Sequence, residues 1–175
     1  MKKAMILIDI QNDYFKGGKW ELYQAEQAAS VAAAALEHSR KNGDEVIFIQ
    51  HINHDMQAPF FCEGTVGCDI HDSVKPLQSE KIIIKHKPNS FYETELEDYL
   101  NNKGITELSI CGMMSHMCID TTVRAAKDLG YNINLIENAC TTRDLIYDGE
   151  VYPAKTVHNV FMAALNGTFA KLCKL

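Results

Sequence analysis

Short, almost continuous apolar runs recur along this chain, and longer amphipathic stretches lie between them. The runs cover residues 4–10, 45–50, 81–85, 107–111, 132–137 and 168–173. Apolar runs of this length, without regular polar alternation, are typical of strands covered on both faces, as in a parallel sheet. We therefore predict six strands in one mostly parallel sheet, with 168–173 at its edge.

The stretches between these runs have the apolar spacing of helices. They cover residues 24–41, 93–102, 117–129 and 153–165, and glycines follow at 43, 104, 130 and 167. Glycine just after an amphipathic stretch is a common helix stop signal. Helices that alternate with parallel strands cover both faces of the sheet, so we predict a three-layer α-β-α fold of the α/β class (Rossmann-like). We expect one domain over residues 1–175.

Charge and hydropathy argue against two classes of partner. The net charge of -6 is unsuited to general nucleic-acid binding, because phosphate backbones attract basic surfaces. No apolar run approaches the roughly 20 residues that span a bilayer, so we expect no membrane insertion. The first apolar run is short and has no small-residue cleavage site after it, which indicates a strand and not a signal peptide.

The six cysteines favour a reducing compartment. A chain of 175 residues can bury a sufficient core without disulfides. We therefore expect free thiols and a cytoplasmic location.

Three reactive side chains lie at the end of a predicted strand or shortly after it. Asp9 ends the first strand, Lys85 ends the third, and Cys118 lies in the first helical turn after the fourth. Ligands of open parallel sheets bind beyond the carboxyl ends of the strands. We therefore expect a carboxylate, an amine and a thiol to converge at one edge of the sheet.

These three groups together can perform acyl transfer. A thiol attacks as its thiolate, which a nearby ammonium and a helix N-terminus favour by lowering the thiol pKa. A carboxylate can take the thiol proton and deliver it to a leaving amine. Each residue also has an ordinary structural explanation, as a cap, a solvated charge or a buried small residue. Only their convergence favours a catalytic site.

Four segments, in order along nearly the whole chain, resemble motifs of the isochorismatase-like cysteine hydrolases, relatives of nicotinamidases and N-carbamoylsarcosine amidases. Residues 8–15 (IDIQNDYF) resemble the opening D-x-Q-x-D-F pattern, and 64–71 (GTVGCDIH) resemble G-T-x-G-x-x-I-H. Residues 85–91 (KHKPNSF) resemble K-x-x-x-S-x-F, shifted by one residue. Residues 112–122 (GMMSHMCIDTT) resemble G-x-x-T/S-x-x-C-V-x-x-T.

The resemblance implies a six-stranded parallel sheet and an Asp–Lys–Cys triad. It makes Asp9 the general acid and base, Lys85 the residue that positions and polarises, and Cys118 the nucleophile. It also implies a cis peptide between Met113 and Met114. The N–H groups of Met114 and Cys118 would then form an oxyanion hole.

The expected substrate is a small molecule, and members of this family are commonly homo-oligomers. Six aromatic residues are candidates to line an apolar pocket or to pack in the core: Tyr14, Phe15, Trp20, Phe60, Phe61 and Phe91. We assign Phe15, Phe60, Phe61, Phe91 and Met113 to the pocket. Trp20 is also a candidate for a subunit contact, and Arg124 for a surface ion pair.

Cys118 favours hydrolysis of a C–N bond in an amide, a carbamoyl or ureido group, or a lactam. Isochorismatases proper, which cleave a vinyl ether, usually lack this cysteine. Nicotinamidases add a metal site, for which His54 matches one ligand. However, Ile52 and Phe61 stand where an Asp and a His are expected, so we predict no metal and no cofactor.

Residues 51–80 form a long irregular segment, typical of a lid or a binding loop. It holds zinc-compatible residue types, namely His51, His54, Cys62, Cys68 and His71, but no C-x-x-C pair. Two alternatives therefore stay open beside the cysteine hydrolase. They are a metal-assisted amidase of the nicotinamidase type and a non-enzymatic α/β module with Cys118 as a redox-sensing thiol.

Overall fold

Six parallel strands form the central sheet of the computed structural model, which describes residues 2–175. They are β1 (Lys2–Ile8), β2 (Glu45–His51), β3 (Lys81–Lys85), β4 (Ile105–Met113), β5 (Asn132–Thr141) and β8 (Lys171–Cys173). Their order across the sheet is β3-β2-β1-β4-β5-β8, and every neighbouring pair is parallel. The predicted sheet is confirmed. The single domain predicted over 1–175 includes Met1, which lies outside the described residues.

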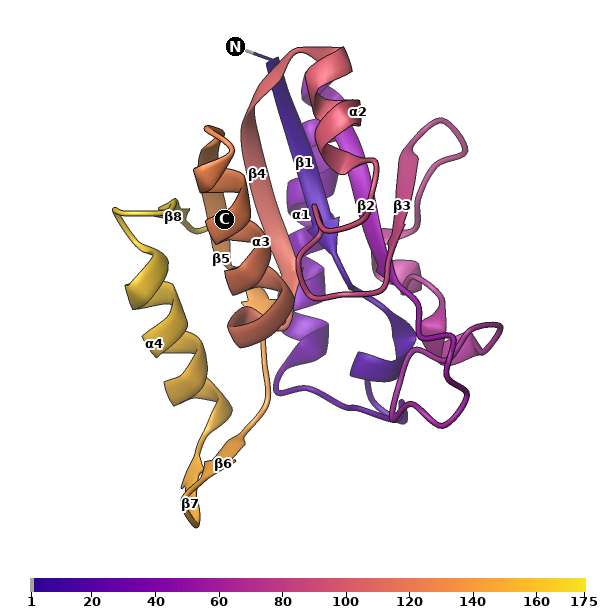
Figure 1. The fold of residues 1–175 in the computed structure, drawn as a ribbon, viewed down its shortest axis with the longest axis vertical. Helices are drawn as coiled ribbons and strands as arrows, with labels where there is room; N and C mark the ends of the chain where they lie inside the picture. The colour runs from indigo at the N-terminus through magenta and orange to yellow at the C-terminus, as the bar shows by residue number, and fades with distance from the viewer. Residues whose placement is uncertain (1) are drawn as a thin grey trace.

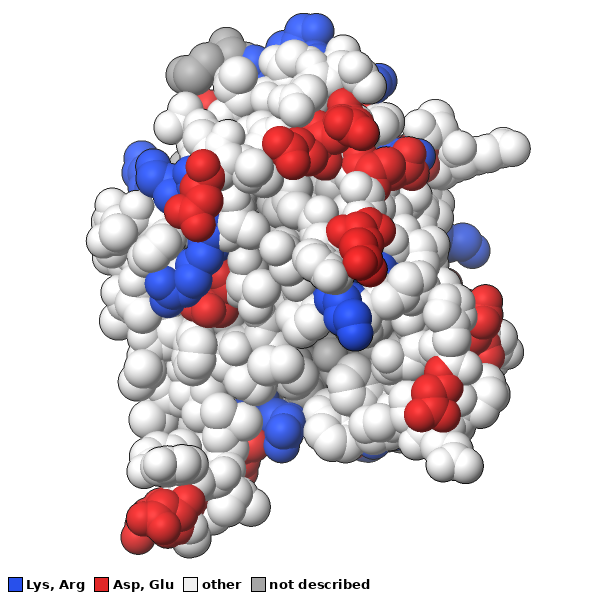
Figure 2. Space-filling model, viewed as in Figure 1, with Lys and Arg blue, Asp and Glu red and all other residues white. Residues whose placement is uncertain are grey.

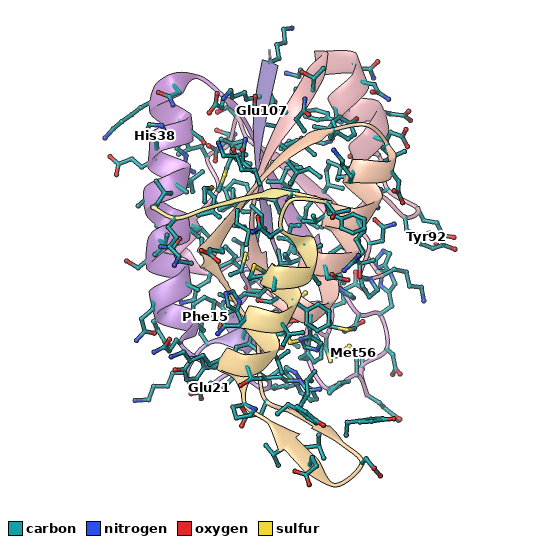
Figure 3. The ribbon with its side chains drawn as sticks, turned by 90° about the vertical axis from the view of Figure 1, so that its left-hand side faces the viewer. Phe15, Glu21, His38, Met56, Tyr92 and Glu107 are labelled. Carbon is teal, nitrogen blue, oxygen red and sulfur yellow. The ribbon has the colours of Figure 1, made fainter. Side chains whose placement is uncertain are left out.

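Four helices cover this sheet (Figure 1). They are α1 (Ala25–Asn42), α2 (Leu96–Lys103), α3 (Asp120–Asp128) and α4 (Ala154–Leu165). α1 lies on one face, α2 and α3 lie on the other, and α4 stands on the side of the sheet formed by β5 and the edge strand β8 (Figures 1 and 3). The α-β-α layering predicted from the alternation of apolar runs and helical stretches is thus confirmed.

Small side chains let α1 approach the sheet closely. Its buried face consists largely of alanines, including Ala28, Ala32 and Ala35. The helix ends at Gly43, whose left-handed backbone (φ 72°) directs its N–H back to the last helical carbonyls. Glycine adopts this conformation without steric cost, which explains why the predicted stop signal works.

Two regions differ from the predicted elements. A π-helical turn over Ser115–Ile119 precedes α3, which begins at Asp120 and not at residue 117. A β6–β7 hairpin (Leu145–Tyr147 and Glu150–Tyr152) follows β5 and was not predicted. Its turn is Asp148–Gly149, both with positive φ, and Asp-Gly is a standard two-residue hairpin turn. The hairpin projects from the lower end of the molecule in Figure 1.

No helix among residues 2–175 combines the length and apolar character that a bilayer crossing requires. Acidic and basic side chains are interspersed over the face in Figure 2 and form no broad basic area there.

Candidate active site

Asp9, Lys85 and Cys118 meet at the carboxyl edge of the sheet. Asp9 is the first residue after β1, Lys85 ends β3, and Cys118 lies in the π-helical turn after β4. The Lys85 ammonium nitrogen is 2.7 Å from Asp9 Oδ2 and donates a hydrogen bond to Cys118 Sγ at 3.2 Å. The structure therefore brings together the three residues that the sequence placed at strand ends.

A tight backbone turn aims Asp9 into the site. Asp9 has a left-handed φ of 52°, and its N–H donates to the Ile49 carbonyl at 3.1 Å. Its side chain is fully buried, and within residues 2–175 its Oδ1 has no hydrogen-bond partner. An unpaired acceptor in the interior is unfavourable, so this oxygen is available to receive a proton or a hydrogen bond from a bound molecule.

Lys85 is a buried cation surrounded by acceptors. Besides the carboxylate and the sulfur, its Nζ donates to His51 Nδ1 at 3.0 Å and to the Lys87 carbonyl at 3.1 Å. Burial works to lower the pKa of Lys85, but its interactions with Asp9 and Cys118 together outweigh burial and the net pKa is raised. The ammonium is therefore fully protonated at neutral pH.

The Cys118 thiol is more basic than the sequence predicted. Burial and the negative charge of Asp9 raise its pKa above the ordinary thiol value, while Lys85 acts in the opposite direction. The sequence-based expectation of a lowered pKa considered only the ammonium and the helix end. It was wrong because Cys118 is buried beside a carboxylate, with only 4% of the residue exposed. Cys118 rests as a thiol and has to lose its proton when it reacts.

His51 completes this cluster, and sequence analysis placed it only in the long loop. It is in fact the last residue of β2, at the same edge as the other three side chains. Burial and the Lys85 charge lower its pKa from 6.5 to about 4, so the imidazole is neutral and accepts at Nδ1. The signal was present, because His51 directly follows the predicted strand 45–50, and Asp9 and Lys85 also lie at the ends of predicted strands.

Gln11 and Asp13 fix the surroundings of the site. The Gln11 side chain bonds both the N–H and the carbonyl of His51 at 2.8 Å, and donates to the Cys68 carbonyl at 2.7 Å. The Asp13 carboxylate accepts from the Phe61 N–H at 2.7 Å. Gly67 lies against that carboxylate, where a Cβ would be only 2.1 Å from Oδ1. The D-x-Q-x-D spacing thus supplies one reactive carboxylate and two anchors for the loop.

Hydrogen bonds at its base close the loop of residues 54–60. Asn53 donates through its N–H to the Phe61 carbonyl at 2.8 Å and through its side chain to the Phe60 carbonyl at 2.7 Å. Residues 54–60 therefore leave and re-enter the body of the protein at one point.

An aromatic wall extends outward from the reactive cluster. It consists of the rings of Phe61, Tyr14, Phe60 and Trp20. The ring centroids are 4.5 Å apart for Tyr14 and Phe61, 5.6 Å for Tyr14 and Phe60, and 5.0 Å for Trp20 and Phe60. The Phe61 ring lies nearest the reactive cluster, with its centroid 6.0 Å from that of His51. Burial, together with the nearby Asp9 carboxylate, raises the pKa of Tyr14. The wall contains two of the predicted pocket residues, Phe60 and Phe61.

The other three predicted pocket residues lie elsewhere in the packing. The Phe15 ring stacks on His71 at 3.6 Å, near the lower end of α1 in Figure 3. Phe91 stacks on Tyr131 at the amino end of β5, so its assignment to the pocket was wrong. The cause is that Ser90 bonds Thr122 of α3 and turns the chain away from the site. Met113 is fully buried in the core.

The turn before Cys118 has the cis peptide that the resemblance implied, between Met113 and Met114. The Met114 carbonyl accepts from the N–H groups of Met117 and Ile119 at 3.0 and 3.2 Å. This π-type pairing holds Cys118 on the inner side of the turn. The oxyanion hole assigned to Met114 and Cys118 remains a prediction.

The zinc-compatible residues of the long loop are dispersed. His54 pairs with Glu63, the Cys62 thiol faces the Ala58 carbonyl, and His71 bonds Ser73. Among residues 2–175, only Asp9, His51 and Cys118 bring three potential ligand atoms together. The Lys85 ammonium already lies between those three atoms, within 2.7 to 3.2 Å of each. This donor set therefore does not fit a metal ion unless Lys85 is displaced.

Comparison with known proteins gives a consistent result. The Isochorismatase domain model matches residues 3–173. The uncharacterized isochorismatase family protein YddQ of Bacillus subtilis is 49% identical over 97% of this chain and 94% of its own length. A solved isochorismatase-type hydrolase from Oleispira antarctica is 41% identical, with a TM-score of 0.96 over 99% of this chain and 93% of that one.

A more distant relative has a named activity. Streptothricin hydrolase of Streptomyces noursei is 30% identical over 82% of this chain and 56% of its own length. The domain match, the relatives and the shared fold together show that this chain belongs to the isochorismatase family and is a hydrolase.

Proposed function

We propose that the protein hydrolyses a C–N bond in a small molecule through a thioester on Cys118. The bond belongs to an amide, a carbamoyl or ureido group, or a lactam. The observation that carries this proposal is the buried Asp9–Lys85–Cys118 cluster, in which one ammonium contacts both the carboxylate and the sulfur. The similarity of the chain to a streptothricin hydrolase is consistent with hydrolysis, but it does not identify the bond that is cleaved.

In the first half of the reaction, Asp9 takes the proton of Cys118 and the sulfur attacks the carbonyl carbon. Lys85 stabilises the charges on both groups while the proton moves. The tetrahedral oxyanion is held by backbone N–H groups of the turn at Met114 and Cys118. Asp9 then gives the proton to the leaving nitrogen, the C–N bond breaks, and a thioester remains.

In the second half, a water molecule replaces the released amine or ammonia. Asp9 takes one proton from this water as its oxygen attacks the thioester carbon. The C–S bond breaks, the acid leaves, and the proton returns to the Cys118 sulfur. Neutral His51 accepts a hydrogen bond from Lys85 throughout and keeps the ammonium directed at the other two groups.

Trapping of the thioester tests this proposal. The protein is incubated with a panel of small amides, ureido acids and lactams, and the peptides are searched by mass spectrometry for an acyl adduct. We expect an adduct on Cys118, slower release in Asp9→Asn, and no turnover in Cys118→Ala. Cys173→Ala, which removes a half-buried thiol of β8, is the matched control. Full turnover by Cys118→Ala would contradict the mechanism.

The two alternative functions make different predictions. A metal-assisted amidase requires stoichiometric metal in the active protein, which elemental analysis of the purified enzyme would detect. A thiol sensor does not need Asp9, so loss of turnover in Asp9→Asn counts against it. The position of Lys85 between the potential ligands favours the metal-independent reaction.

We also propose that the chain forms a homo-oligomer through the β6–β7 hairpin. Ile146 and Tyr147 on this hairpin are each 76% exposed, and Val160 on the adjacent α4 is also exposed. Exposed apolar patches of this kind are typical of subunit contacts. Light scattering should give a multiple of the chain mass, and Ile146→Asp should reduce it to the monomer.

We also propose that the protein is located in the cytoplasm. All six cysteines are free thiols, which suits a reducing compartment. Cell fractionation followed by detection of the protein tests this directly.

A further inference from the structure

His158 is a half-buried histidine of α4 that contacts the turn of the nucleophile. Its Nδ1 lies 2.8 Å from the hydroxyl oxygen of Ser115. Ser115 is the first residue of the π-helical turn Ser115–Ile119, which also holds Cys118. This hydrogen bond therefore joins a helix at the side of the sheet to the segment that carries the reactive sulfur.

The Ser115 hydroxyl has no other hydrogen-bond partner among residues 2–175. The side chain is fully buried, so solvent cannot replace His158 as its partner. A buried hydroxyl whose proton is unpaired is unfavourable, so Ser115 has to donate this proton to His158 Nδ1. The imidazole that accepts it is neutral and carries its own proton on Nε2.

The turn has few anchors to the rest of the protein. Its backbone bonds close it on itself, because two of its N–H groups donate to the Met114 carbonyl. Cys118 itself contacts Lys85. Two other side chains of the turn bond distant segments: Ser115 bonds α4, and His116 bonds the residue that follows β5. The Ser115 anchor lies next to Met114, whose N–H is assigned to the oxyanion hole.

The imidazole also lines a cavity of about 580 Å³ between α1, β5 and α4. Protons can therefore reach His158 from this side, although Ser115 is sealed in the interior. Burial lowers the pKa of His158 below 6.5, and the negative charge of Glu137 acts in the opposite direction. The imidazole is thus neutral at pH 7. The titratable groups around the cavity and in the adjoining turn are Tyr23, Glu137, Cys140, Lys155, Lys174 and His116.

We propose that His158 is a positioning residue for Cys118. As the neutral acceptor of the Ser115 proton, it holds the turn in the shape that keeps the sulfur beside Lys85 and Asp9. An imidazolium has no free lone pair, so protonation of His158 removes the only acceptor of Ser115 and releases the turn. This inference rests on the proposed function for the importance of Cys118, but the link between α4 and the turn does not depend on it.

Two variants of His158 differ in the acceptor alone. Asparagine branches at the same carbon as histidine and can place an amide oxygen near the position of Nδ1, whereas leucine has this branching but no acceptor. His158→Asn should therefore keep the bond to Ser115, and His158→Leu should lose it. Ser115→Ala removes the same bond from the other side. His38→Leu, at an exposed histidine of α1 that bonds Asn42, is the matched control.

Alkylation of Cys118 by iodoacetamide, mapped by peptide mass spectrometry, reports on the turn without a substrate. Burial raises the pKa of this thiol, so a released turn exposes the sulfur and lowers the pKa. We expect His158→Leu and Ser115→Ala to react roughly 10-fold faster at neutral pH, since thiol reactivity follows pKa and exposure. His158→Asn and His38→Leu should react like the unmodified protein. The double variant Ser115→Ala/His158→Leu should react no faster than either single variant, because both remove one bond.

The pH dependence separates positioning from space filling. Protonation of His158 releases the turn, so the alkylation rate of the unmodified protein, divided by that of His158→Asn, should rise as the pH falls below 6.5. The rate of His158→Leu divided by that of His158→Asn should stay constant, because neither variant has a titrating group at this position. A histidine that only fills space would give a constant ratio in both comparisons, which would overturn the inference. Equal alkylation of His158→Leu and His158→Asn at neutral pH would overturn it as well.

Turnover separates this inference from the proposed function. With a substrate found in the thioester screen, His158→Leu should lower kcat roughly 10- to 100-fold with little change in KM, as small displacements of reacting groups do. His158→Asn should restore most of the lost kcat. The predicted alkylation pattern without any thioester would support the positioning role and count against the hydrolase mechanism. A thioester on Cys118 with an unchanged kcat in His158→Leu would support the mechanism and overturn the positioning role.

Discussion

Removing one member of the buried Asp9–Lys85 pair should destabilise the fold far more than removing both. In Lys85→Met the apolar stem of the side chain is kept and only the charge is lost, which leaves the Asp9 carboxylate unpaired. In Asp9→Asn the carboxylate charge is lost and the Lys85 ammonium is left unpaired. Asparagine tolerates the left-handed backbone that residue 9 adopts. Both side chains are completely shielded from solvent, so water cannot replace the missing partner.

The magnitude follows from the geometry. Opposite charges 2.7 Å apart attract each other by about 6 kcal/mol at an effective dielectric constant of about 20. Desolvation of both groups offsets most of this, so the intact pair adds little net stability. Loss of one partner leaves the desolvation cost of the other uncompensated, at about 3–5 kcal/mol. We expect the double variant to cost at least about 3 kcal/mol less than the sum of the single variants.

Urea unfolding followed by Trp20 fluorescence and by circular dichroism measures these free energies. Lys41→Met removes an exposed ion pair with Glu37 and is the control, for which little change is expected. If the costs of Asp9→Asn and Lys85→Met simply add, the two groups do not share a buried electrostatic interaction, and the proposed site loses its physical basis.

Three further predictions concern the same edge of the sheet. The Asp9 charge raises the pKa of Cys118, and Lys85 lowers it. Asp9→Asn should therefore speed iodoacetamide alkylation of Cys118 at neutral pH, and Lys85→Met should slow it. A change in the same direction in both variants would refute the opposing effects of Asp9 and Lys85 on this thiol. Because the pKa of His51 falls from 6.5 to about 4 on folding, the unfolded chain binds a proton in this range that the folded chain does not, and the free energy of unfolding should drop by roughly 3 kcal/mol from pH 7 to 4. His51→Gln should remove this part of the pH dependence in urea titrations, and an unchanged dependence would contradict it. Gly112→Ala should prevent folding, as judged by circular dichroism, because φ is 130° and a Cβ would lie 2.0 Å from a carbonyl oxygen of β1.

The sheet and the central triad were predictable because they depend on local patterns. Apolar runs such as 81–85 specify buried strands, and parallel strands bring their carboxyl ends together. Asp9, Lys85 and Cys118 could therefore be placed at one edge without any distances. The β6–β7 hairpin was also visible in principle, because Asp148–Gly149 is a strong turn signal.

Other features of the site depend on contacts between distant segments and could not be predicted in this way. Phe91 faces the amino end of the sheet because Ser90 bonds Thr122, which is 32 residues away. The raised pKa of Cys118 reflects the degree of burial, which spacing does not reveal.

The closed loop between Asn53 and Phe61 has a consequence for how this protein can acquire new specificities. Both ends of the loop are fixed, at Asn53 by its bonds to the Phe60 and Phe61 carbonyls and at Phe61 by the Asp13 carboxylate. Residues 54–60 can therefore be replaced or lengthened without moving the reactive atoms, since a longer surface loop has a small entropic cost. A library confined to these seven positions would vary the Phe60 part of the aromatic wall while it preserves the chemistry, and would give laboratory evolution a defined starting point.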